Sequence, residues 1–211
     1  NLQILAIWPL ILVFLLHEYD DVTQQVFPFI SAYLLVCKRY PALILAELTA
    51  EILTKIIVKM RWEEDEEDDE QFPEIRAKLK TFQDTIAALN PEVYLQKVPF
   101  VIQESLFESK SLPKWTTLEL GLFELSNFAD SLRSNLIGIP KDQITLLKPY
   151  GVFQEFFVKL VNSDWILSMN HPLIQLLFFE LIVRHYPFLK VTEDQLIVFR
   201  TLHLFTSPCG I

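Results

Sequence analysis

Apolar residues between positions 71 and 89 recur at alternating steps of three and four, which is the spacing of one face of an α-helix. The stripe consists of Phe72, Ile75, Leu79, Phe82, Ile86 and Leu89. In residues 42–60 the same spacing predicts that Leu45, Leu48, Ile52, Ile56 and Met60 point inward and that Glu51, Lys55 and Lys59 point outward. Each such stripe must be buried against another, so we expect an all-α fold.

Nine helices are predicted, at residues 2–18, 22–40, 42–60, 71–89, 92–108, 115–135, 147–163, 170–187 and 192–206. Similar lengths and short connectors favour antiparallel pairs stacked side by side, with a period of about 40–55 residues that is near the roughly 40–47 of HEAT and armadillo repeats. We therefore predict a HEAT-repeat α-solenoid over residues 1–211, a right-handed superhelix of about four to five repeats. A single globular bundle remains open from periodicity alone.

Helix starts are marked by cap residues. Asn90-Pro91-Glu92 places a cap before a first-turn proline and an acid, and Asn170-His171-Pro172 resembles it. Thr192 and Gln195 have the spacing of a capping box.

A run of eight carboxylates follows Arg61-Trp62 and carries eight of the nine net negative charges of the chain. Its members are Glu63, Glu64, Asp65, Glu66, Glu67, Asp68, Asp69 and Glu70. One interpretation is a solvated loop that self-repulsion keeps extended, and the other is an electrostatic contact with a basic partner. We expect residues 61–71 to form an acidic insertion between two helices, with Trp62 packing at its base.

Composition and motifs exclude several classes of protein. The apolar segment 4–16 is shorter than the roughly 20 residues of a membrane span, and no Lys or Arg precedes Lys38, so we predict a core helix without membrane insertion. Cys37 and Cys209 lie far apart and are expected to be free thiols, and no metal is predicted. With four glycines, the phosphate-binding loops and nucleophile elbows of common enzymes cannot be assembled, so we predict no catalysis. The chain is also expected to be a piece of a longer protein.

Three stretches carry a family resemblance. Met60-Arg61-Trp62 and the acidic run are followed by Phe72, Arg76, Leu79-Lys80, Asp84 and Ile86-Ala87 at spaced positions. The other two stretches are Asp20-Asp21-Val22 with Val26-Phe27-Pro28-Phe29, and His171-Pro172-Leu173 through Phe188. Over nearly its whole length the chain resembles the middle of exportin-T, a tRNA exportin of the importin-β (karyopherin-β) superfamily.

The resemblance implies a nuclear export receptor that binds mature tRNA together with RanGTP and carries them through the nuclear pore. It implies contacts with nucleoporins, shuttling between nucleus and cytoplasm, and no cofactor beyond the GTP held by Ran. It also implies that the acidic run joins the outer and inner helix of one repeat, and that helices 22–40, 71–89, 115–135 and 170–187 line the concave face. By analogy with an acidic loop of importin-β, the run would contact Ran; alternatively, it would occupy a basic groove and exclude nonspecific RNA.

Basic residues on the expected inner helices are the candidates for tRNA contact: Lys38, Arg39, Arg76, Lys78, Lys80, Arg133 and Arg184. Ordinary solvent-facing charge is the alternative for each of them. Two other functions stay open at this point, namely a karyopherin for protein cargo and a static HEAT scaffold unrelated to Ran.

Overall fold

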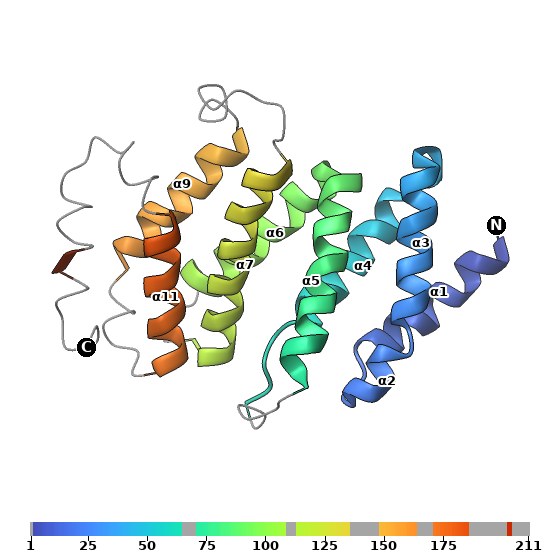
Figure 1. Cartoon of the computed structure of the whole chain (residues 1–211), viewed down its shortest axis with the longest axis horizontal. Helices are drawn as coiled ribbons and strands as arrows, with labels where there is room; N and C mark the ends of the chain where they lie inside the picture. The colour runs from blue at the N-terminus through green and yellow to red at the C-terminus, as the bar shows by residue number, and fades with distance from the viewer. Residues whose placement is uncertain are drawn as a thin grey trace. The chain divides into compact units, whose positions relative to one another are not determined.

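The structure is a computed structural model that describes residues 2–64, 71–108, 113–135, 148–163, 171–185 and 202–203. In these ranges the regular elements are helices, and none of them is long and apolar enough to cross a membrane (Figure 1). The chain divides into two compact units, Asn1–Lys97 and Val98–Ile211, which are described separately.

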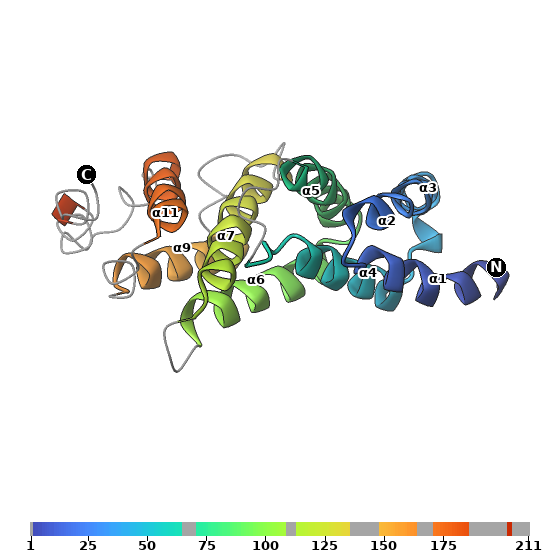
Figure 2. The same ribbon diagram turned by 90° about the horizontal axis from the view of Figure 1, so that it is seen from below.

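The first unit consists of α1 (Leu2–Leu15), α2 (Asp20–Gln24), α3 (Phe27–Arg39), the short 3-10 helix η1 (Pro41–Leu43), α4 (Ala46–Lys59), α5 (Phe72–Leu89) and the start of α6 (Pro91–Phe107). Helices α1 and α4 lie in one layer, and α2, α3 and α5 lie in the other (Figure 2). Helix α4 packs on α5, and α3 packs on α5 within its layer. This unit therefore holds two stacked helix pairs: α1 packs against α2 and, through Trp8 and Tyr33, against α3, and α4 packs against α5.

The predicted helix 22–40 is broken in the structure, because α2 ends at Gln24 and α3 begins at Phe27. Pro28 lies in the first turn of α3. Proline lacks an amide hydrogen, which is no loss in a first turn but removes a hydrogen bond inside a helix, so the chain starts a new helix here.

Helix α4 begins at Ala46, later than the predicted start at residue 42. Leu45 precedes the helix with extended backbone angles and is 44% exposed, so the prediction that it packs inward was wrong. The prediction that Lys59 points outward was also wrong, since its side chain is only 10% exposed. In contrast, Ile52, Ile56 and Met60 are fully buried as predicted.

Helix α5 confirms the predicted stripe from Phe72 to Ile86, while Leu89 is half-buried. Its buried face is wider than the stripe, because Arg76 and Gln83 are also buried. After α5, the Asn90 side chain accepts a hydrogen bond from the amide of Val93 at 3.3 Å, which confirms the predicted cap of α6.

The second unit contains the rest of α6, α7 (Trp115–Asn135), α9 (Lys148–Val161) and α11 (Pro172–His185). Helices α7 and α11 pack closely side by side, and α9 packs on α7 from the other layer (Figures 1 and 2). Gly121 lets α6 approach α7: a Cβ atom there would lie 2.6 Å from Leu106 Cδ2 and 2.9 Å from Ser105 Cβ.

Helices α7, α9 and α11 begin and end within three residues of the predicted positions. The predicted helix 192–206 lies outside the described residues except for 202–203. The layered helix pairs confirm the predicted all-α fold of HEAT type.

Candidate nucleic-acid interface

The acidic run lies in the sequence between α4 and α5, two helices that pack on each other. Glu63 and Glu64 are exposed, and Asp65–Glu70 lie outside the described residues. At its base the Trp62 and Phe72 rings lie 4.4 Å apart between centroids, at an interplanar angle of 55°. This is the packing predicted for Trp62, and it fixes the two ends of the run close together.

Two of the basic candidates, Lys38 and Arg39, lie in the last turn of α3. Both side chains are exposed, and the described part of the chain provides neither with an ion pair. A helix C-terminus carries partial negative charge, so cations there stabilise the helix and remain available to an anionic ligand.

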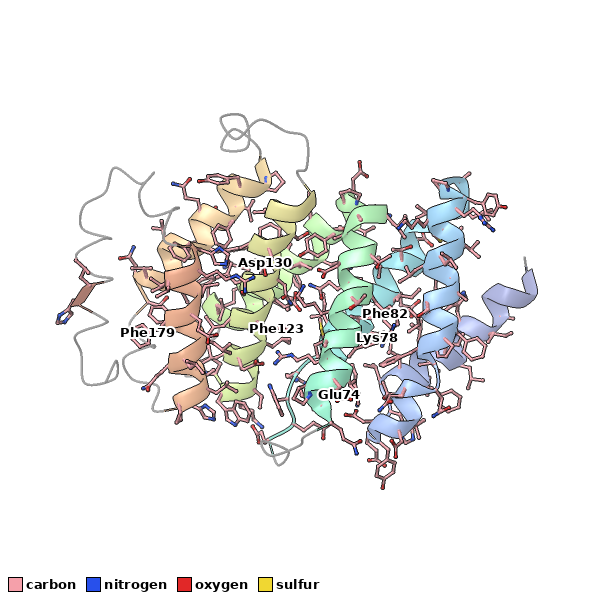
Figure 3. The ribbon with its side chains drawn as sticks, viewed as in Figure 1. Glu74, Lys78, Phe82, Phe123, Asp130 and Phe179 are labelled. Atoms are coloured by element: carbon pink, nitrogen blue, oxygen red, sulfur yellow. The ribbon has the colours of Figure 1, made fainter. Side chains whose placement is uncertain are left out.

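The three candidates on α5 have different surroundings, and Figure 3 labels one of them, Lys78, near Phe82. Arg76 is 7% exposed, and its guanidinium carbon lies 5.7 Å from the centroid of the Phe72 ring. The Lys78 ammonium is exposed and lies 5.1 Å from the centroid of the Phe82 ring. Lys80 forms an ion pair with Asp84 one helical turn away, at 2.7 Å. Of the three, only Lys78 is both exposed and without a described carboxylate partner.

In the second unit, Arg184 of α11 forms an ion pair with Asp130 of α7 at 2.8 Å. The arginine is 55% exposed, so a ligand could reach it, but the carboxylate neutralises much of its charge. Arg133 lies near the end of α7, and its side chain is outside the described residues.

Two described histidines pack against aromatic rings, and the described cysteine is buried. His171 stacks on Trp115 with centroids 4.4 Å apart, and His185 is buried with its ring 5.5 Å from that of Phe153. Cys37 is a buried free thiol, as predicted, and Cys209 lies outside the described residues. In the described ranges no group of His, Cys, Asp and Glu could hold a metal ion.

One polar contact, that of Lys59, could not be predicted from the sequence. The Lys59 ammonium lies 2.8 Å from Asp20 Oδ1 and donates a hydrogen bond to the His17 carbonyl, also at 2.8 Å. These partners are about 40 residues away along the chain, and no local spacing indicates them.

Paired helices in two layers, with exposed cations on one layer and an acidic insertion inside a pair, define a helical-repeat protein of HEAT type that presents charged surface for binding. The family model of Exportin-T matches residues 1–206. The chain therefore belongs to the Exportin-T family, a family of transport receptors and not of enzymes.

Curated relatives support the same assignment. An Exportin-T of Debaryomyces hansenii is 53% identical over 220 residues and one of Scheffersomyces stipitis is 52% identical over 218 residues, each covering 100% of this chain. An Exportin-T of Yarrowia lipolytica is 30% identical over 247 residues and covers 99% of it. The chain spans 22–23% of the length of these relatives.

Proposed function

We propose that this chain is a segment of a nuclear export receptor that binds mature tRNA together with RanGTP and passes with them through the nuclear pore. The observation that carries the proposal is the Exportin-T match over residues 1–206, joined to a described HEAT-type architecture. The receptor would act by binding, move between nucleus and cytoplasm with nucleoporin contacts on its path, and need no cofactor other than the GTP on Ran.

Within this segment, Lys38 and Arg39 are the best-placed contacts for the phosphates of tRNA. They are exposed and adjacent, and they make no ion pair within the described residues. Folded RNA is recognised largely through its shape and its phosphates, which suits two unpaired cations on a helix end. Lys78 is the next candidate. Lys80 and Arg184 would first have to break their ion pairs with Asp84 and Asp130 before they could bind a phosphate.

The acidic run is proposed to act on a basic partner surface. Phosphates would be repelled by it, so a direct contact with tRNA is disfavoured, and a contact with Ran is the first hypothesis. The test replaces Glu63–Glu70 by Ser and Gln in the full-length protein. A weaker affinity for RanGTP supports the contact, increased binding of nonspecific RNA supports a guarding role, and no change in either removes both hypotheses.

Capture by the full-length protein tests the function as a whole. We expect tRNA to be retained when Ran carries a non-hydrolysable GTP analogue and to be lost with RanGDP, because each ligand should raise the affinity for the other. Ran-dependent capture of proteins without tRNA would instead indicate a protein-cargo karyopherin. Assembly that ignores Ran altogether would indicate a static scaffold.

A matched pair of variants tests the basic contact. Lys38→Gln with Arg39→Gln removes two charges from α3, and Lys55→Gln with Lys97→Gln removes two half-buried ones from α4 and α6. If both α3 residues contact phosphates, the first variant should lower the slope of log K against log salt by about two. Equal slopes in the two variants would contradict the contact.

A further inference from the structure

Lys59, at the C-terminal end of α4, reaches across to the corner where α1 gives way to α2. Its ammonium lies 2.8 Å from Asp20 Oδ1 and 2.8 Å from the His17 carbonyl oxygen. Asp20 opens α2, and His17 lies in the connection after α1. One side chain of the second helix pair therefore holds both sides of a turn in the first pair.

The other hydrogen bonds of the corner are local. The Thr23 hydroxyl is within reach of the Leu15 carbonyl at 3.4 Å and of the His17 carbonyl at 3.3 Å. The Tyr19 amide donates to His17 Nδ1 at 3.1 Å. These contacts shape the turn but do not tie it to α4, which Lys59 does.

This ion pair is more shielded from water than three others in the described chain. The side chains of Lys59 and Asp20 are 10% and 15% exposed, against 31% and 46% for Lys80 and Asp84. The pairs Lys159–Glu155 and Arg184–Asp130 are also more exposed. Water screens a shielded pair less, and removal of one partner leaves the other charge buried without compensation.

The same end of α4 is the start of the acidic run. The Met60 amide donates to the carbonyls of Ile56 and Ile57, and the Arg61 amide donates to that of Val58. Trp62 then packs on Phe72. Only Met60 and Arg61 separate Lys59 from Trp62, so a displacement of the start of the run moves the backbone that carries Lys59.

We propose that Lys59, Asp20 and the His17 carbonyl form a latch that couples the α1–α2 corner of the first helix pair to the start of the acidic run in the second. Displacing Met60–Trp62 withdraws the ammonium and loosens the corner. By the same coupling, a change at the corner loosens the end of α4. The latch does not depend on which ligand binds the run.

Hydrogen exchange in the full-length protein tests the coupling. Asp20→Asn removes the charge at the corner, and we expect exchange at the Met60 and Arg61 amides to rise about tenfold. Lys59→Met should accelerate exchange at Val22 and Thr23, whose amides bond to the Tyr19 carbonyl. The double variant should accelerate exchange no more than the larger single effect, because Lys59→Met already removes the ion pair that Asp20→Asn breaks.

Two control variants neutralise charged side chains that, in the described chain, form no ion pair with Lys59. Asp21→Asn removes an exposed charge from the same helical turn, so any effect on the α2 dipole appears there too. Lys80→Met with Asp84→Asn breaks a more exposed pair than Lys59–Asp20 and should leave exchange outside α5 unchanged. If Lys59→Met fails to fold, Lys59→Gln removes the same charge and takes its place.

The proposal is overturned if Asp20→Asn accelerates exchange only at residues 17–23 and leaves Met60 and Arg61 unchanged. That result would make the ion pair a local support of the corner. An effect of Asp21→Asn equal to that of Asp20→Asn would overturn it as well, since the dipole of α2 would then be the cause.

Discussion

The Trp62 indole and the Phe72 phenyl ring meet with centroids 4.4 Å apart, one just before the acidic run and the other just after it. Self-repulsion of eight carboxylates favours an extended chain, whereas this contact holds the ends of the segment together. The packed rings therefore let a highly charged connector join two helices that pack on each other.

We expect the two rings to depend on each other energetically. Trp62→Leu and Phe72→Leu, taken singly and together, should give a coupling free energy of about 0.5–1.5 kcal/mol, typical of aromatic pairs. The readout is exchange at the Glu74 and Ile75 amides, which bond to the Gln71 carbonyl. Additive effects would mean that the rings merely lie close.

Gly121→Ala should destabilise the second unit. The new methyl group would lie 2.6 Å from Leu106 Cδ2 and 2.7 Å from Leu106 Cγ, so α6 and α7 must move apart. Overpacking costs about 1–3 kcal/mol, which exceeds the gain of up to about 1 kcal/mol from replacing a helical glycine by alanine.

Gly151→Ala is the matched control, since in the described chain no atom outside the backbone of α9 itself lies within 4 Å of the new methyl group. It should raise the melting temperature slightly, while Gly121→Ala lowers it. A gain in both variants would show that α6 and α7 do not approach as closely as described.

Asn90→Ala should weaken the start of α6 by about 1 kcal/mol, because the amide of Val93 loses the side-chain oxygen that caps it. Faster exchange at Val93 and Tyr94 would report the loss. Asn90→Asp retains a cap oxygen and should restore most of the protection; if it behaves like alanine, the hydrogen bond is not the cause.

Alkaline pH should destabilise the fold through two tyrosines. Burial is the main cause that raises the pKa of Tyr33, although its hydrogen bond with Thr49 opposes this, and burial also raises the pKa of Tyr150. Above about pH 10, the ordinary pKa of a tyrosine, these phenols ionise in the unfolded chain before they ionise in the folded one. Stability is therefore full below that pH and falls as pH rises through the higher folded pKa.

The check is the melting temperature between about pH 9.5 and 11. Tyr33→Phe and Tyr150→Phe should each make the decline of the melting temperature with rising pH shallower. Tyr19→Phe removes a phenol that is 65% exposed and is the control. A decline equally steep in all three variants would contradict the assignment.

Local patterns were sufficient for much of the fold. The stripe of α5 and the cap at Asn90 followed from spacing and residue type, because a helix must bury one face and satisfy its first amides wherever it lies. The break between α2 and α3 could have been predicted from Pro28, but the apolar periodicity continues across it and hid the break. The assignment of tRNA contacts stays a prediction, since charge in a sequence does not tell which cations are already paired.

By itself, the sequence determined that this chain forms amphipathic helices in pairs, with an acidic segment inside one pair, because these properties depend on residues a few positions apart. Only the tertiary structure decided that Arg76 is buried against Phe72 while Lys38 stays exposed, and that Lys59 turns inward to Asp20. Long charged side chains can reach several environments from one backbone position. The partner that captures such a side chain is set by packing between segments far apart in the chain.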